Sequence, residues 1–285
     1  MKDFKDKVGV VTGAASGIGL GIANKCIQEK MKVVIADIDI KRLHRVEKRM
    51  KREGATVIAV PTDVSKPEDI EYLAKMALDT YEQVHLLINN AAVANTKYTW
   101  NYTLNDWKWQ LGVNLFGVIN GIRTFIPIML KQDNECHIIN ISSMEGLLSG
   151  SGPGGAIYGA SKHGILSLTE TLRTELQLIG AKLKVSVVCP GWVKTRIIYG
   201  DIHRPIEYQN SPEDIIEDTR NEDIAKAYGI ENAFKDSPPI SREEAAEIIF
   251  QGIREEKLYI LTHKDKYLKG LVKQRFNEII KAFKD

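Results

Sequence analysis

Short apolar segments alternate with segments of helical periodicity from the N-terminus to residue 189. Continuous apolar strands suit a parallel sheet buried on both faces, and their alternation with helices predicts βαβ units. We therefore expect one α/β domain over residues 1–285, built on a doubly wound parallel sheet. The expected strands are 8–12, 32–37, 56–60, 86–89, 137–142 and 184–189, and the expected helices are 18–29, 67–81, 104–130 and 158–179.

A glycine-rich turn, TGAASGIG, occupies Thr12 to Gly19, between the first expected strand and the first expected helix. Glycines permit a tight turn and let the backbone approach a pyrophosphate, while the free N–H groups that begin the helix favour an anion. This strand–turn–helix arrangement is typical of a Rossmann-type sheet and predicts a dinucleotide site. The residues expected to contact the dinucleotide here are Gly13, Ser16, Gly17, Ile18 and Gly19.

An acidic residue, Asp37, ends the second expected strand. A carboxylate at this position can accept hydrogen bonds from both ribose hydroxyls and would repel a 2′-phosphate. The sequence therefore favours NAD over NADP as cofactor. The counter-argument is that Lys41 and Arg42 are close enough in sequence to reach such a phosphate.

Polar residues also end the next two expected strands. Asp63, followed by Val64, could hold the adenine amino group. Asn89 and Asn90, followed by Ala91, could tie the strand edge together or contact the adenosine ribose, and we favour a structural role for Asn89.

Tyr158 and Lys162 stand four residues apart on an expected helix, so they share one face. A nearby cation favours the phenolate, which would let Tyr158 give or take a proton near neutral pH. Ser142 and Ser143 end the preceding strand, where a hydroxyl can bind a substrate oxygen. Asn114 lies in the long helix before that strand.

Together these residues resemble the short-chain dehydrogenase/reductase family in its one-domain form, across residues 5–195. The matching motifs are the glycine turn, Asp63, the Asn89–Ala91 strand end, Asn114, the Ser142–Ser143 pair, Tyr158 with Lys162, and the PGWVKT run from Pro190 to Thr195.

The resemblance implies a role for each matched position. Ser143 and Tyr158 hold the reacting oxygen, Tyr158 transfers the proton, and Lys162 lowers the proton affinity of the tyrosine and binds the nicotinamide ribose. Asn114 holds a water that links Lys162 to solvent. Pro190, Gly191, Val193 and Thr195 belong to the cofactor site, with Thr195 and the backbone near Val193 orienting the carboxamide.

The chain departs from the family pattern at three places. Ala92 replaces the usual glycine of an NNAG motif. The paired serines leave the catalytic one ambiguous, and we favour Ser143, since the pattern usually uses the second. The segment 144–157 is longer than usual, which affects one wall of the pocket.

Large apolar residues follow several strand ends, and they predict a bulky hydrophobic substrate. Arg196 and Arg204 are the arginines that could instead bind a carboxylate. A proline-rich, acidic stretch at about 196–240 is long enough to be a substrate lid. The expected substrate residues are Val93, Met144, Leu147, Leu148, Trp192, Ile197 and Tyr199.

The bulk composition limits the partners. A net charge of +2 does not indicate a nucleic-acid partner. The three cysteines are far apart in apolar runs, which predicts neither a disulfide framework nor a metal site. The charged N-terminus lacks the pattern of a signal peptide, so we expect a cytoplasmic location.

The C-terminal segment, about 264–284, predicts a basic amphipathic helix. We expect this helix to pack on the body or on a neighbouring subunit, with contact to a membrane surface as the weaker alternative. The resemblance implies a homodimer or homotetramer formed through the two long helices, 104–130 and 158–179.

The leading hypothesis is thus an oxidoreductase that moves a hydride between NAD(H) and a hydrophobic, steroid-like or cyclic, secondary alcohol or ketone. The alternative enzyme is an NADPH-dependent ketone or ketoacyl reductase. The non-enzyme alternative is a dinucleotide-binding regulatory protein, against which the full set of Asn114, Ser143, Tyr158 and Lys162 argues.

Overall fold

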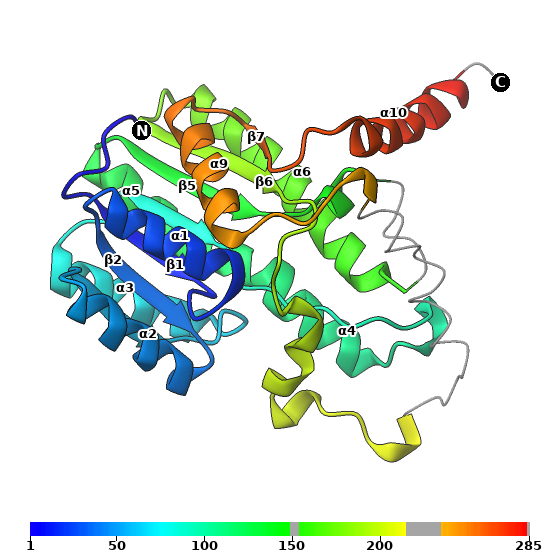
Figure 1. The fold of residues 1–285 in the computed structure, drawn as a ribbon, viewed down its shortest axis with the longest axis horizontal. Helices are drawn as coiled ribbons and strands as arrows, with labels where there is room; N and C mark the ends of the chain where they lie inside the picture. Colours follow the sequence, from blue (N-terminus) through cyan, green and yellow to red (C-terminus); the bar gives the residue numbers. More distant parts are fainter. Residues whose placement is uncertain (149–153, 215–234, 284–285) are drawn as a thin grey trace.

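A seven-stranded parallel sheet forms the centre of the protein, with strand order β3-β2-β1-β4-β5-β6-β7. The computed structural model describes residues 1–148, 154–214 and 235–283, and helices cover both faces of the sheet (Figure 1). The architecture confirms the doubly wound α/β prediction. The strands are β1 Val8–Thr12, β2 Lys32–Asp37, β3 Val57–Pro61, β4 Leu86–Asn89, β5 Cys136–Ile141, β6 Leu183–Cys189 and β7 Tyr259–Leu261.

The strands are apolar throughout because the sheet is buried on both sides. Val10 and Val34 pack on one face and Val11 and Val33 on the other, and all four side chains have no exposed surface. Helices α1 (Gly17–Gln28), α2 (Ile40–Arg52) and α9 (Arg242–Arg254) cover the face of Val11 and Val33. Helices α3 (Pro67–Tyr81), α5 (Gly117–Gln132) and α6 (Ala156–Leu178) cover the face of Val10 and Val34.

The strand order reverses between β1 and β4, which lie side by side although two strands separate them in sequence. At such a switch point the connections leave in opposite directions and open a crevice at the carboxyl ends of the strands. The sheet therefore provides a ligand site beside the glycine turn, which directly follows β1.

The long helix expected at 104–130 is divided in three. Helix α4 (Leu104–Leu111) runs into a wider π-type turn, η2 (Gly112–Phe116), which continues as α5. By length and composition this run could cross a membrane, but Phe125 and Met129 are buried in the core against the sheet. We therefore treat it as a helix of the domain.

Three elements lie outside the sequence expectations. Helix α2 is amphipathic and buries Leu43, Val46 and Met50. Helix α9 packs beside α1. Strand β7, which follows α9, pairs with β6 at the edge of the sheet. Strand β7 has only three residues, which is too short to give a recognisable period.

The segment expected as a lid begins with short 3₁₀ turns, η4 (Ile197–His203), η5 (Ile206–Tyr208) and η6 (Pro212–Asp214). The part of the expected lid at 215–234 lies outside the described residues. Residues 237–240 return to the body, where Val193 and Ile240 form a parallel bridge.

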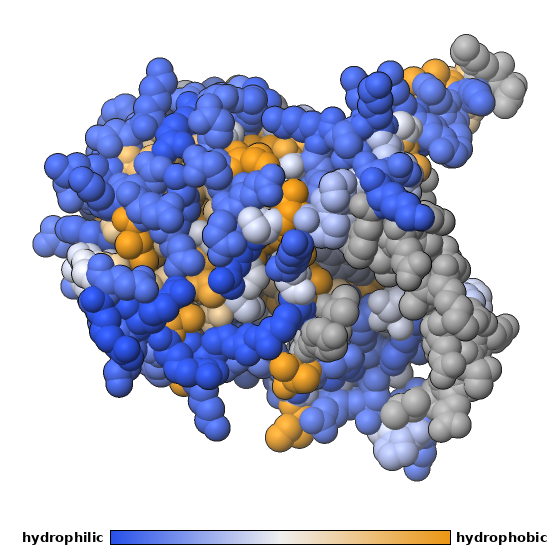
Figure 2. All heavy atoms as spheres, in the orientation of Figure 1, coloured by the Kyte–Doolittle hydropathy of each residue, from blue (hydrophilic) through white to orange (hydrophobic). Residues whose placement is uncertain are grey.

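The C-terminal helix is α10 (Lys266–Lys281). Its first turns pack on the body through Leu268, Leu271 and Val272. Its later half projects from the domain (Figure 1), with Phe276 and Ile280 each about half exposed. Figure 2 shows apolar atoms on this projecting part, on a surface that is otherwise mostly hydrophilic.

Two histidines are buried in the neutral form at the amino edge of the sheet. Burial, together with the positive charges of the N-terminus and Lys184, lowers the pKa of His137 to about 3. Ser186 donates to the Lys257 carbonyl, so Nε2 of His137 must donate to Ser186 across 2.8 Å. Nδ1 of His137 then has no hydrogen-bond partner among the described residues. Burial, with the charges of Lys7 and Lys32, lowers the pKa of His85 to about 4.

These pKa values predict that the protein loses stability on mild acidification. A folded-state pKa below the unfolded value of about 6.5 means that the contribution is complete above that pH and is lost as the pH falls toward the folded-state pKa. Between pH values of about 7.5 and 5.5, each imidazole should cost about 1 kcal/mol of unfolding free energy. Urea unfolding at both pH values measures this. His137→Gln should reduce the loss, and an unchanged loss would contradict the assignment.

Candidate active site

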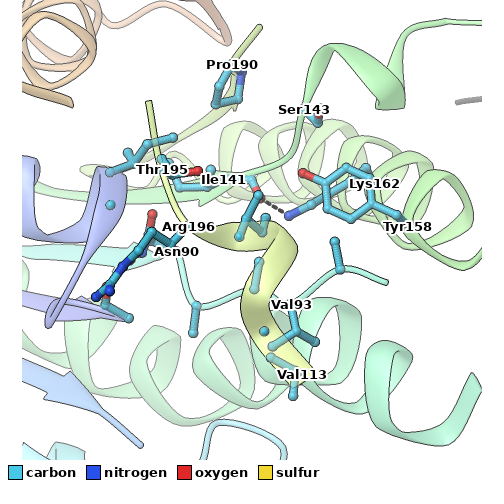
Figure 3. A pocket seen from close by; sticks show the side chains of 18 of the residues that line it. Asn90, Val93, Val113, Ile141, Ser143, Tyr158, Lys162, Pro190, Thr195 and Arg196 are labelled. Atoms are coloured by element: carbon cyan, nitrogen blue, oxygen red, sulfur yellow. Dashed lines mark hydrogen bonds between the residues drawn. The ribbon is translucent and has the colours of Figure 1, made fainter. Parts of the chain in front are cut away.

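A cavity of 1090 Å³ runs along the carboxyl edge of the sheet. Its walls come from the glycine turn, the ends of β2 to β6, the turns of the lid segment and the start of α10. Figure 3 shows Ser143, Tyr158 and Lys162 on one side of this space and Asn90, Thr195 and Arg196 on the other. All of the cofactor and catalytic positions predicted from the sequence, except Gly19 and Asn114, therefore line one cavity.

The glycine turn has no room for side chains at its tightest points. Gly13 has a φ of +65°, and a Cβ there would lie 2.8 Å from Nδ2 of Asn90. Gly19 does not line the cavity, although the sequence placed it among the cofactor contacts. A Cβ at Gly19 would lie 2.3 Å from the Gly13 carbonyl oxygen. Its role is to let helix α1 approach the turn, while Gly13, Ser16, Gly17 and Ile18 line the cavity.

Asn90 joins the glycine turn to the end of β4. Its backbone N–H donates to Thr12 Oγ1 at 2.9 Å, and its side-chain amide donates to the Thr12 carbonyl at 2.8 Å. Asn89 instead bonds Asn140 on the neighbouring strand at 2.9 Å, in keeping with the structural role favoured for it. Asn90 and Ala91 line the cavity.

Asp37 lies at the far end of the cavity, where its carboxylate accepts the N–H groups of Ala15 and Asp39, each at 2.9 Å. Burial is the main cause that raises its pKa above the ordinary value, against these hydrogen bonds. Each carboxylate oxygen has more than one lone pair, so Asp37 can accept further bonds from a ligand. Asp63 and Val64 line the same end, and Asp63 holds Ser65 through its carboxylate.

The PGWVKT run lies above the centre of the cavity, and the C-terminal part of the chain holds it there. The Gly191 N–H donates to Thr262 Oγ1 at 3.1 Å. Thr262 contacts His263 Nδ1 at 2.8 Å, and His263 Nε2 lies 3.1 Å from the Pro238 carbonyl. Because that carbonyl accepts, Nε2 carries a proton. Motif reasoning missed both residues, which follow β7 directly.

The two neighbouring serines face different partners. Ser142 is buried and donates to the Lys162 carbonyl at 2.7 Å. Ser143 accepts the Glu145 N–H at 3.2 Å and forms a hydrogen bond with Tyr158. The geometry thus distinguishes the pair and places Ser143, the serine favoured from the sequence, beside the tyrosine hydroxyl.

Lys162 lies behind Tyr158, with Nζ 5.3 Å from the centre of the phenol ring. The ammonium donates to the Ile141 carbonyl at 2.9 Å (Figure 3). Burial lowers the pKa of Lys162 to about 7. Burial, with the charge of Glu145, also raises the pKa of Tyr158 to about 12, against the hydrogen bond with Ser143. Burial thus dominates the pKa of Tyr158 in the protein alone, and the expected lowering of that pKa by Lys162 stays a prediction.

Asn114 lies in the π-type turn η2 and is fully buried. Its amide accepts from the Val93 N–H at 2.8 Å and donates to the Val93 carbonyl at 2.9 Å. It also donates to Ser161 on the catalytic helix at 3.3 Å. Asn114 therefore connects the loop after β4 to α6, one residue from Lys162.

The remaining lining residues form the expected substrate end. Val93, Met144, Leu148, Trp192 and Ile197 line the cavity. Leu147, also expected there, packs instead in the core with Val118 and Met144. The side chain of Tyr199 lies outside the described part of the structure.

The sequence missed a contribution from α10, whose Tyr267, Leu268 and Leu271 line the same cavity. The periodic spacing of apolar residues predicts helix α10, but it does not show which surface of the domain this helix covers. Arg196 lines the cavity, whereas Arg204 does not. Among the described residues, no group of three or more His, Cys, Asp or Glu side chains is placed to hold a metal ion.

The site fits a dinucleotide in two respects. Because no side chain fits at Gly13, the bare backbone of the turn borders the cavity, and the N–H groups at the start of α1 favour a phosphate there. A partly buried carboxylate, Asp37, lines the same cavity and could bind a ribose.

Comparisons with known proteins agree with this geometry. The family model for short chain dehydrogenases matches residues 7–201. The CLA biosynthesis dehydrogenase/reductase of Lactiplantibacillus plantarum is 32% identical over 98% of this chain and 95% of its own. The 1-deoxy-11-beta-hydroxypentalenate dehydrogenase of Streptomyces exfoliatus is 35% identical over 69% of this chain and 71% of its own.

Among solved structures, a short chain dehydrogenase/reductase from Burkholderia phymatum in complex with NAD matches with a TM-score of 0.89. It is 39% identical and the match covers 98% of this chain and 96% of that one. The chain belongs to the short-chain dehydrogenase/reductase family. It is an oxidoreductase of that family, with a nicotinamide dinucleotide as cofactor.

The close packing at Gly19 gives a test of the glycine turn. Gly19→Ala forces α1 and the turn apart, and should weaken NADH binding by at least about tenfold, since a misplaced backbone loses its bonds to the pyrophosphate. Gly270→Ala is the matched control, because a Cβ at that helical position meets nothing within 4 Å. Fluorescence titration with NADH measures both. Equal affinities in the two variants would contradict the packing argument.

Proposed function

We propose that this chain is an NAD-dependent dehydrogenase that interconverts a bulky hydrophobic secondary alcohol and its ketone, as a homo-oligomer in the cytoplasm. The observation that carries the proposal is the grouping of Ser143, Tyr158 and Lys162 at one end of a cavity whose other end holds Asp37. Hydroxyl, phenol and amine are the groups that proton transfer at an alcohol oxygen requires.

In the oxidation direction, Ser143 and Tyr158 hold the alcohol oxygen between their hydroxyl groups. The O–H proton passes to the phenolate oxygen of Tyr158 as the carbinol C–H bond breaks. A nicotinamide dinucleotide, which the glycine turn and Asp37 would hold, would supply the acceptor for the hydride when bound in its oxidised form. In the reverse direction, Tyr158 returns the proton to the ketone oxygen.

Lys162 assists this transfer through its charge. Its ammonium lies near the phenol ring and is fixed by the Ile141 carbonyl. When protonated, it favours the phenolate and offsets part of the desolvation that raises the pKa of Tyr158. Asn114 contributes by joining Val93, in the loop after β4, to Ser161 on α6, the helix that carries Tyr158 and Lys162. The water that the family resemblance implies beside Asn114 is part of this proposal.

The preference for NAD is supported by Asp37, which would stand against a 2′-phosphate, and by the NAD complex of the Burkholderia phymatum relative. Arg42 favours the alternative, an NADPH-dependent reductase, because it lines the cavity and belongs to a neighbouring basic groove. Asp39 pairs with Arg42 at 3.5 Å, which reduces the charge that Arg42 offers to a phosphate.

Titration with NADH and NADPH separates these alternatives. The wild-type protein should bind NADH at least about tenfold more tightly, because a phosphate beside a carboxylate is repelled. Asp37→Ala should reduce the preference for NADH over NADPH, and Arg42→Gln should leave that preference unchanged. Tighter NADPH binding that Arg42→Gln abolishes would contradict the proposed cofactor preference.

The substrate class follows from the lining of the catalytic end. Val93, Met144, Leu148 and Trp192 follow the ends of three strands, β4, β5 and β6, and α10 adds Leu271. An apolar wall with few polar groups favours a large apolar substrate. The polar groups near the reacting atom then fix the orientation of that substrate. The name of the hydroxypentalenate dehydrogenase, a relative over most of this chain, is consistent with such a substrate.

A substrate panel tests the activity. With NAD⁺, the protein should oxidise cyclohexanol, borneol and 2-decanol faster than sorbitol or glycerol. Tyr158→Phe should reduce the rate by about 10² to 10⁴, the usual contribution of a proton-transfer group, while it keeps NADH affinity. Tyr259→Phe is the control, because its hydroxyl bonds Glu170 at the surface. Faster oxidation of the polyols would overturn the substrate class. NADH binding without turnover of any substrate would favour the regulatory alternative.

A further inference from the structure

A buried carboxylate, Asp106, stands in the first turn of α4, outside the catalytic group. Its side chain has no exposed surface. Lys97 Nζ lies 2.8 Å from one oxygen and Arg204 Nη1 lies 2.7 Å from the other. The Thr103 N–H completes a helix-capping box at 3.0 Å. A buried charge is costly unless it is paired and hydrogen-bonded, so this arrangement is specific rather than incidental.

The partners of Asp106 come from three parts of the chain. Lys97 and Asn95 belong to the loop after β4, and Thr103 caps α4. Arg204 and Asn210 belong to the turns η4 to η6 of the lid segment. Burial alone would raise the pKa of Asp106, but the bonds from Lys97 and Arg204 hold it well below its usual range. The carboxylate thus stays charged and joins the three segments at neutral pH.

Arg204 uses its whole guanidinium group in this contact. Beside the bond to Asp106, Nη2 lies 2.7 Å from Asp201. The guanidinium carbon stands 4.4 Å above the centre of the Trp109 ring, and only 9% of the side chain is exposed. A planar fork that pairs with carboxylates and stacks on an aromatic ring is a geometry that lysine does not reproduce.

The contact lies directly behind the substrate end of the cavity. Trp109 is part of the cavity wall, and so are Ile197, Ile202 and Pro205, the last of which follows Arg204. A second tie runs in parallel, from Thr103 Oγ1 to Asn210 at 2.6 Å. Two other contacts of the described part of this segment, between His203 and Asp39 at 4.0 Å and between Lys66 and Glu207 at 3.8 Å, are longer and more exposed, and such contacts contribute little.

We propose that Asp106 and Arg204 form a clasp that positions residues 197–210 as one wall of the substrate cavity. Arg204 is a positioning residue, since it acts through this segment and Trp109 and does not reach the substrate. Because Arg204 is paired with Asp106, its guanidinium is not available to bind a carboxylate group of a substrate. The residues of this wall that face the alcohol are then the apolar Ile197, Ile202 and Pro205. The kinetic test of this clasp, the KM for the alcohol, rests on the proposed function, whereas the structural test, hydrogen exchange, does not.

The kinetic test compares Arg204→Met and Arg204→Lys with wild type, using NAD⁺ and the fastest of cyclohexanol, borneol and 2-decanol. Arg204→Met should raise the alcohol KM by at least about tenfold and change the NADH Kd by less than about twofold, because only the substrate wall is displaced. Arg204→Lys should lie between, since it keeps the charge but not the fork.

Arg254→Met provides a matched control. Arg254 also pairs with a carboxylate, Glu29 at 2.6 Å, and lies 5.2 Å above a phenyl ring, that of Phe4, but it is remote from the cavity. This control should lower the Tm without raising the alcohol KM. A similar KM in Arg204→Met and Arg254→Met would overturn the proposal.

Hydrogen exchange supplies a readout that needs no substrate. In Arg204→Met and in Asp106→Asn, amides of residues 197–210 should exchange at least about tenfold faster, while those of α6 stay protected, because only the local opening is affected. Unchanged exchange at 197–210 would overturn the clasp whatever the activity. If the wild type oxidises no alcohol but exchange accelerates as expected, the clasp stands and the proposed function fails.

Discussion

The burial of Lys162 fixes the geometry of the whole catalytic end. Only 2% of its side chain is exposed, and its Nζ is held by the carbonyl of Ile141, the last residue of β5. The backbone carbonyl of Lys162 accepts a hydrogen bond from the Ser142 hydroxyl. The end of β5 and helix α6 are therefore joined twice, once by the lysine side chain and once by the serine. Tyr158, one helical turn earlier, is thereby set beside Ser143. A lysine in this position is costly, and burial lowers its pKa to about 7. The protein thus keeps a titratable group, rather than a permanent charge, behind the phenol.

The rest of the structure is arranged around that edge of the sheet. The glycine turn approaches from β1, pinned by Asn90, and the PGWVKT run approaches from β6, held by Thr262 and His263. Each support comes from a segment far away in sequence. The substrate wall is supported in the same way by Asp106 and Arg204. Polar side chains that are buried or partly buried and hydrogen-bonded therefore determine where the three walls of the cavity lie, while apolar packing forms the layers of the domain.

Local patterns were sufficient to predict the fold and most of the cavity. Strands buried on both faces, such as Val8–Thr12, are apolar throughout, and glycine spacing marks the turn that follows. Contacts between distant segments leave no local pattern, which is why the sequence did not reveal Arg204 as a partner of Asp106, or Leu268 and Leu271 as cavity residues. The raised pKa of Tyr158 could not be predicted from the sequence for another reason. Charge proximity can be read from a four-residue spacing, but desolvation depends on how the entire domain closes over the pair.

Direct hydride transfer from an alcohol carbon to the dinucleotide is the central property proposed for this cavity. Cyclohexanol, borneol and 2-decanol, each deuterated at the carbinol carbon, would be incubated with the protein and NAD⁺, and the mass of the reduced dinucleotide measured. The account predicts one deuterium in each reduced dinucleotide formed, and none derived from deuterated solvent when the alcohol is unlabelled. Reduced dinucleotide that carries hydrogen from solvent, or no reduced dinucleotide from any of these alcohols, would contradict it.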